Sequence, residues 1–203
     1  MKKLLITTTL IGSLISSIAS AENKNQFSIS IINSKIENDY KSTTLNQPTA
    51  YDSDGSSISF ALNYGYKIEL PNNLFVTPGV FYDNINNLAK ESSPADKEKI
   101  NYRYGLKADL GYNVLDNLAV FGSLGLATVK YDIDWQSNNP FSKSGDDTSL
   151  VYGAGLSYDV TKDIFVTAEY NFQSVELEAN TSTNNQHYDS DIEVFKLGIG
   201  YQF

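Results

Sequence analysis

The last nine residues of the chain alternate strictly between two kinds of side chain. The odd positions are all large and apolar: Phe195, Leu197, Ile199, Tyr201 and Phe203. The even positions between them are small or polar: Lys196, Gly198, Gly200 and Gln202. In an extended strand these two sets point to opposite faces. A strand with one wholly apolar face and one small or polar face suits a wall between lipid and a filled lumen.

The same alternation runs up to and away from three short turns, at residues 71–73, 115–117 and 161–163. It predicts strands before the turns over 58–68, 100–112 and 150–158, and after the turns over 76–82, 120–126 and 166–172. Residues 27–31 and 195–203 supply a first and an eighth strand. The first, third and fifth strands fit the pattern least well; in the third Pro78 removes a ladder donor, and in the fifth Gly122 lies on the apolar face.

The connections at the other end of these strands are expected to be long, over about residues 34–57, 84–99, 132–149 and 174–191, and rich in Asn, Ser, Thr and Asp. Three short turns on one side and four long loops on the other, with both termini on the short-turn side, are typical of membrane barrels. We therefore predict an all-β fold, an eight-stranded antiparallel up-and-down transmembrane β-barrel with no open edge. A soluble cup of the lipocalin type is the alternative for eight strands.

The N-terminal residues have the pattern of a signal peptide. Lys2 and Lys3 precede an apolar stretch over 4–18, and Ala19, Ser20 and Ala21 form a small-residue cleavage site. We predict that residues 1–21 are removed and that residues 22–203 form the barrel domain. An N-terminal membrane anchor is the alternative. The absence of Cys excludes a disulfide scaffold, a thiol nucleophile and a Cys-based metal site.

The signal peptide, the eight alternating segments and the terminal Leu197, Ile199, Tyr201, Phe203 pattern resemble the small outer-membrane barrel family. That family includes the membrane domain of outer membrane protein A and the opacity-type surface proteins. The resemblance implies a bacterial outer membrane location with both termini periplasmic, surrounded by lipid and lipopolysaccharide. It also implies that these four residues form the signal read by the barrel assembly machinery. It implies no activity, because such barrels serve as anchors, adhesins, small pores and a few lipid-modifying enzymes.

Charged residues occupy the inward positions of the predicted barrel: Lys67, Glu69, Arg103, Lys107, Asp109, Glu169 and Lys196. An eight-stranded barrel is only just wide enough for its own side chains, so these should fill it. Glu169 and Lys196 lie on neighbouring strands at similar depth and are predicted to pair, because buried charges need partners. The network is either a structural plug or, if Lys107 or Arg103 competes for Glu169, a gate. Phe75 and Phe165 should narrow the turn end.

The formal net charge of −9 becomes −11 once Lys2 and Lys3 are removed, and the four long connections together carry −9 of it. This exposed negative charge argues against nucleic acid as a partner. Acids occur there in close pairs: Asp52 and Asp54, Asp132 and Asp134, Asp146 and Asp147, Asp189 and Asp191. They form either a solvated acidic surface or divalent-cation sites, although no complete calcium-loop spacing is present. Trp135, the only Trp, is either a membrane-edge anchor or a ligand contact.

An enzymatic function would depend on His187, the only His in the chain, with Ser190, Asp189 and Asp191 close to it in sequence. Residues that are close in sequence within a polar segment are not thereby held in the geometry that catalysis requires. We therefore expect no enzyme, no cofactor and no resident metal. The sequence predicts a surface protein that acts structurally or as an adhesin, contacting a host surface or another extracellular ligand through its loops. A narrow gated pore is the main alternative, and a lipid-modifying barrel is a further one.

Overall fold

The computed structural model describes residues 24–42, 52–90, 97–135, 141–180 and 185–203, so the predicted signal peptide lies outside the described residues. Side chains are described within 24–37, 55–87, 99–133, 142–176 and 189–203. The strands are β1 (Lys24–Ser42), β2 (Asp52–Glu69), β3 (Leu74–Asp83), β4 (Asn87–Lys90), β5 (Lys97–Leu115), β6 (Leu118–Trp135), β7 (Phe141–Asp159), β8 (Ile164–Asn180) and β9 (Asn185–Gln202). None of the described residues form a helix that is long and apolar enough to span a membrane.

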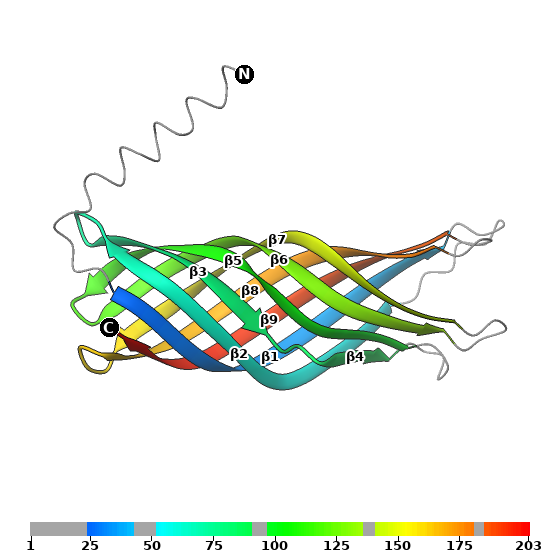
Figure 1. Ribbon diagram of the computed structural model, residues 1–203, viewed down its shortest axis with the longest axis horizontal. Helices are drawn as coiled ribbons and strands as arrows, with labels where there is room; N and C mark the ends of the chain where they lie inside the picture. Colours follow the sequence, from blue (N-terminus) through cyan, green and yellow to red (C-terminus); the bar gives the residue numbers. More distant parts are fainter. Residues whose placement is uncertain (1–23, 43–51, 91–96, 136–140, 181–184) are drawn as a thin grey trace, which may run out of the picture.

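The strands form one closed antiparallel barrel (Figure 1), in which β1 pairs with both β2 and β9. Because β3 and β4 both pair with β5 and follow each other along it, they occupy one place in the wall. The barrel therefore has the eight wall positions predicted from the alternation. The start of β1 and the C-terminus lie together at the short-turn end, where Asn25 N donates to Phe203 O at 2.8 Å.

The three short turns lie where the sequence predicts them, between β2 and β3, β5 and β6, and β7 and β8. Asn72 and Asn73 adopt positive φ angles of 63° and 62°, a conformation that Asn tolerates better than most residues. Pro78 is accommodated by a local break in pairing. The β2–β3 ladder passes from Gly65↔Gly79 to Ile68↔Val76, so the missing N–H of Pro78 interrupts a ladder that resumes on either side.

Three of the four connections predicted to be long, 34–57, 132–149 and 174–191, are for the most part strand, so the expectation was wrong for them. In the fourth, 84–99, the strands among the described residues cover only 87–90 and 97–99. β1 continues to Ser42 and β2 begins at Asp52, and β6 with β7 and β8 with β9 extend in the same way. β3, in contrast, ends at Asp83, and the short β4 is the only described strand between it and β5. The reason for the three extensions is that the alternation continues but changes sides. In β1, Ile29 and Ile31 point outward and are 50% and 68% exposed, whereas Ile32 and Ile36 point inward and are buried. A segment with polar outward positions was mistaken for a loop.

The barrel wall thus has two parts. In the part nearer the turns, here called the apolar belt, outward side chains are apolar, as a lipid-facing surface requires. Beyond it lies the part that we call the extension, with polar outward side chains and an apolar interior. The extension comprises residues 33–42, 52–57, 84–90, 97–102, 128–135, 141–148, 174–180 and 185–193.

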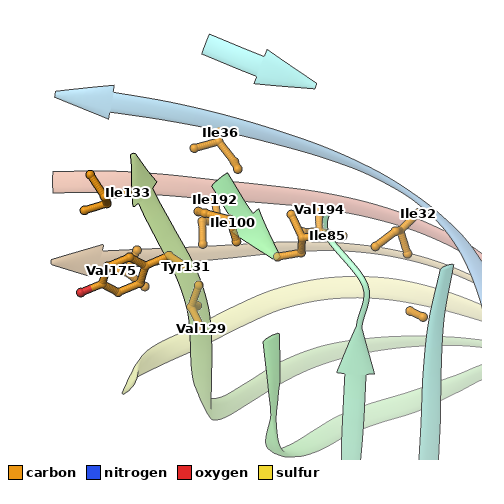
Figure 2. Packing of buried hydrophobic residues seen from close by; sticks show 11 residues of the cluster. Ile32, Ile36, Ile85, Ile100, Val129, Tyr131, Ile133, Val175, Ile192 and Val194 are labelled. Atoms are coloured by element: carbon orange, nitrogen blue, oxygen red, sulfur yellow. The ribbon is translucent and has the colours of Figure 1, made fainter. Parts of the chain in front are cut away.

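A cluster of buried, mainly aliphatic residues fills the interior of the extension and of the wall directly next to it (Figure 2). Its members come from most of the wall: Ile32, Ile36, Ala61, Ile85, Ile100, Val129, Tyr131, Ile133, Val175, Ile192 and Val194. Burial of these side chains from many strands stabilises the extension as a hydrophobic core stabilises a soluble barrel. The lumen is therefore closed by apolar side chains at this level.

Among the described residues the wall is interrupted at two places. The β7–β8 ladder ends at Val151↔Gln173, so residues 141–150 and 174–180 share no ladder. The other interruption lies between β2 and β4. Residues 52–60 of β2 pair with β1 on one side, whereas β4 pairs with β5 and leaves the other side of β2 without a ladder. Side chains bridge this seam: Asn87 Nδ2 donates to Gly55 O at 2.9 Å, and Ser57 Oγ donates to Ile85 O at 2.5 Å. Asn87 and Ile85 are both buried, so the seam is closed by packing and by hydrogen bonds.

Candidate functional site

The predicted inward charges all lie in the lumen, where they form three groups at different depths. The deepest group is centred on Asp83, at the end of β3. Its carboxylate accepts Arg103 Nε at 2.8 Å on one oxygen and Lys196 Nζ at 2.7 Å on the other. All three side chains are buried, with exposed fractions of 0%, 0% and 2%. One carboxylate therefore pairs with two buried cations, and the group keeps a net charge of +1.

Neighbouring side chains complete this group. Arg103 Nη1 donates to Gln173 Oε1 at 3.1 Å, and Gln173 Nε2 in turn donates to Ala127 O at 3.0 Å. The ring of Phe81 lies beneath both cations, with its centroid 5.0 Å from Lys196 Nζ and 5.8 Å from Arg103 Cζ. Hydrogen bonds and cation–π contacts of this kind offset part of the cost of burying charge.

The second group lies nearer the turns and is centred on Lys107. Its ammonium contacts Glu169 at 2.7 Å and Asp109 at 3.3 Å. Ser123 Oγ lies 2.6 Å from an oxygen of Asp109 and 3.1 Å from an oxygen of Glu169, and its single proton satisfies one of them at a time. This group has two acids and one base, whereas the Asp83 group has one acid and two bases. The two groups together are neutral.

The predicted ion pair between Glu169 and Lys196 is not the one that forms. The two residues face each other in the β8–β9 register, as expected from their positions. Their charges are nevertheless directed to Lys107 and Asp83. Asp83 was missed because it falls between the predicted strand, which ends at residue 82, and the predicted connection, which begins at residue 84. Asp83 lies two residues after Phe81, so the alternation would have placed both side chains on the inner face.

The third group lies at the turn end, where Lys67 and Glu69 form an ion pair of 2.7 Å and Asn113 Nδ2 donates to Glu69 at 3.2 Å. A cavity of about 80 Å³ extends from this mouth as far as Lys107 and Glu169. Phe75 and Phe165 point inward here, as predicted. Their rings lie against Gly111 and Gly200, where a Cβ would be only 2.1 and 2.2 Å from the ring.

From the turns outward, the lumen therefore consists of a small polar cavity, two layers of buried charge and an apolar core. No group of three or more His, Asp or Glu side chains within the described ranges is placed to hold a metal ion. With the charges paired and the extension packed, the geometry is that of a plugged barrel.

Comparison with known proteins agrees with this architecture. The model of the outer membrane protein beta-barrel domain matches residues 6–203. The chain belongs to this outer membrane β-barrel family. A comparison with curated protein sequences found no match.

Solved outer membrane barrels share the fold. Ail, the attachment invasion locus protein of Yersinia pestis, is 20% identical, with a TM-score of 0.53 and coverage of 90% of this chain and 99% of Ail. OprG from Pseudomonas aeruginosa is 14% identical, with a TM-score of 0.58 and coverage of 88% and 96%. The outer membrane protein AlkL is 13% identical, with a TM-score of 0.62 and coverage of 89% and 90%. At these identities the likeness concerns the fold alone.

In this outer membrane barrel the terminal pattern Leu197, Ile199, Tyr201 and Phe203 lies on the lipid-facing side, with each side chain more than half exposed. The residues considered for catalysis do not form a site among the described side chains. Ser190 is buried on the inner face, whereas Asp191 is exposed on the outer face and accepts Ser174 Oγ at 2.5 Å. The side chains of His187 and Trp135 lie outside the described residues.

Proposed function

We propose that this outer membrane barrel acts as a closed surface protein that presents its extension for attachment. The observation that supports this most is the apolar core of the extension, because a packed interior leaves the outer wall and the connections as the surfaces free to act. In barrels of this family the short turns are periplasmic. The same arrangement here would place both termini in the periplasm and the extension at the cell surface, above the lipid and lipopolysaccharide.

The charge of the extension restricts the kind of partner that this proposal allows. Ail has been solved in complex with the heparin analogue sucrose octasulfate, a polyanion. In the present chain, a formal charge of −9 is carried by the four regions that contain the extension, residues 33–57, 84–102, 128–148 and 174–193. Glu37, Glu176 and Asp191 are among its exposed acids. Such a surface repels sulfate groups, so we propose a protein ligand with basic or uncharged contact residues.

The lumen network of Lys67, Glu69, Arg103, Lys107, Asp109, Glu169 and Lys196 is, in this proposal, a plug that fixes the register of the wall. The C-terminal Leu197, Ile199, Tyr201 and Phe203 act as the signal for the barrel assembly machinery. A gated pore is the second candidate. Glu169 forms its ion pair with Lys107 but faces Lys196 in the strand register, so it could exchange the first partner for the second. Such an exchange would open only the charged layers, and conduction would also require the apolar core of the extension to separate.

Attachment can be tested with liposomes that contain the folded mature barrel, passed over immobilised extracellular-matrix proteins and over immobilised heparin. We expect retention on at least one matrix protein, weakened at roughly 0.5 M salt, where the Debye length is only a few ångströms. Neutralising Glu176 and Asp191 to Gln and Asn should weaken it as well. Liposomes without the barrel are the control. Retention on heparin alone, or on none of the surfaces, would contradict the proposal.

A further inference from the structure

A groove lies on the outer wall of the extension, across β5, β6 and β7. Its volume is about 340 Å³, within the range of sites that hold small ligands. Side chains that point outward supply its chemistry: Asn101, Tyr102, Lys130, Asp132, Ser144 and Asp146. The groove is separate from the lumen, and the ligand inferred for it does not depend on the attachment proposed above.

A β-bulge builds one side of the groove. The β5–β6 register shifts between Ile100 and Tyr102, so Asn101 is an extra residue opposite β6. Ile100 remains buried inside, while Asn101 and Tyr102 both lie on the outer face. A bulge commonly redirects a side chain in this way. Here it places an amide beside an aromatic ring.

The polar groups of the groove are held in fixed positions. Asp132 accepts Asn101 Nδ2 at 2.7 Å on one oxygen and Ser144 Oγ at 2.6 Å on the other. The hydrogen bond from Ser144 has the largest effect in lowering the pKa of Asp132, and the hydrogen bond from Asn101 lowers it further. Lys130 Nζ contacts Asp146 at 2.8 Å. A carboxylate oxygen accepts more than one hydrogen bond and an ammonium donates three, so both pairs retain capacity for a ligand.

The height of the groove indicates what it faces. Leu126 is the last apolar outward residue of β6, and Lys130 lies four residues further along. At about 3.3 Å per residue and the usual strand tilt, Lys130 is about 10 Å beyond the hydrocarbon. The headgroup layer of ordinary phospholipids is about 5–8 Å thick, so the groove lies at its outer edge, where the larger headgroups of glycolipids extend. Below the groove, Tyr102 lies in a row of rings, with its centroid 5.6 Å from that of Tyr82 and 6.3 Å from that of Tyr104.

From these observations we infer that the groove binds a saccharide, namely the sugar headgroup of a membrane glycolipid. The ring of Tyr102 offers an apolar platform for a sugar ring, and fixed carboxylate, amide and ammonium groups match its hydroxyls. With two acids and one base the groove is net negative, so it selects sugar hydroxyls or amines over phosphates. The same sugar could reach the groove as a free oligosaccharide, and the experiment separates the two sources.

The test uses the mature barrel in lipid nanodiscs, observed by NMR through the backbone amide of Gly145 and the side-chain amide of Asn101. In one arm, dephosphorylated core oligosaccharide from lipopolysaccharide is titrated into phospholipid nanodiscs. In the other, the nanodisc contains lipopolysaccharide. Shifts in the second arm, with or without the first, support a glycolipid headgroup. Shifts in the first arm alone support a free saccharide in the same groove.

Two variants connect any shift to the groove. Tyr102→Ala removes the platform, and Asp146→Asn is a milder surface change that preserves the fold. Each should weaken binding about tenfold, because Tyr102→Ala removes the apolar surface against the sugar ring and Asp146→Asn removes one charge-assisted contact. Glu37→Gln is the matched control, since Glu37 belongs to another outward ion pair, with Lys35 on β1, and should change affinity less than twofold. No shift in either arm, or binding that both groove variants leave unchanged, would overturn the inference.

Discussion

Asp83 is the residue on which the buried charge of the lumen depends most. Its two oxygens contact Arg103 and Lys196 at 2.8 and 2.7 Å, and none of the three side chains is exposed by more than 2%. Asp83→Asn keeps the size of the side chain but removes its charge, which leaves two buried cations without their counter-ion. Breaking a buried pair in this way costs about 3–5 kcal/mol. We expect the free energy of unfolding of the barrel to fall by about that amount.

The assay is equilibrium unfolding in urea of the barrel in liposomes, with the folded fraction read from the mobility of unheated samples on a gel. Asp146→Asn is the control, because it removes one partner of the outward ion pair with Lys130 and should cost less than about 1 kcal/mol. Replacing the whole group, with Asp83→Leu, Arg103→Met and Lys196→Met, should recover most of the loss, since no buried cation is then left without its counter-ion. A midpoint for Asp83→Asn that matches the parent would refute the reasoning.

Two other predictions concern the turn end and the outer wall. Gly200→Ala would place a Cβ 2.2 Å from the ring of Phe165 and should lower the free energy of unfolding by about 1–3 kcal/mol in the same assay. Gly122→Ala is the control, because the nearest atom to its Cβ would be 3.9 Å away, and it should cost less than about 1 kcal/mol. Equal effects of the two variants would contradict the packing. Asp132 has its folded pKa lowered below the usual 3.8, so it stabilises the barrel above about pH 4 and loses this contribution as pH falls through the folded pKa. Its carboxylate signal should titrate below 3.8 by NMR, and Asn101→Ala should raise the midpoint, whereas a parent midpoint at or above 3.8 would exclude the hydrogen bonds as the cause.

The apolar belt could be predicted from sequence because lipid imposes one rule on every outward position there. The turns follow from the points where the alternation stops. The inward charges follow from their positions in the alternation, since they occupy the positions between the outward apolar residues. The extension could not be assigned in the same way. Beyond the belt, Ile32 and Ile36 switch to the inner face, so the outward positions become polar and the segment looks like a loop. A search for apolar residues at inward positions would have found this change.

Ion-pair partners are harder to predict than inward positions. The alternation places Glu169 and Lys196 on the inner face, and the strand register places them opposite each other. Both predictions are confirmed. The partner of each charge also depends on strands across the lumen, which register alone does not relate. Lys107 reaches Glu169 from β5, and Asp83 reaches Lys196 from β3. The groove was missed as a site for a similar reason, since it depends on a bulge at Asn101 that no residue pattern announces.

The measurement that tests the closed barrel most directly is single-channel current through the mature chain in a planar bilayer. Folding is confirmed separately on a gel, and a known porin in the same bilayer shows that openings are detectable. With two charged layers and an apolar core in series, the protein should give no discrete openings. Openings that recur in the parent and change in the Glu169→Ala, Lys196→Ala double variant would contradict the plug and establish a gated pore.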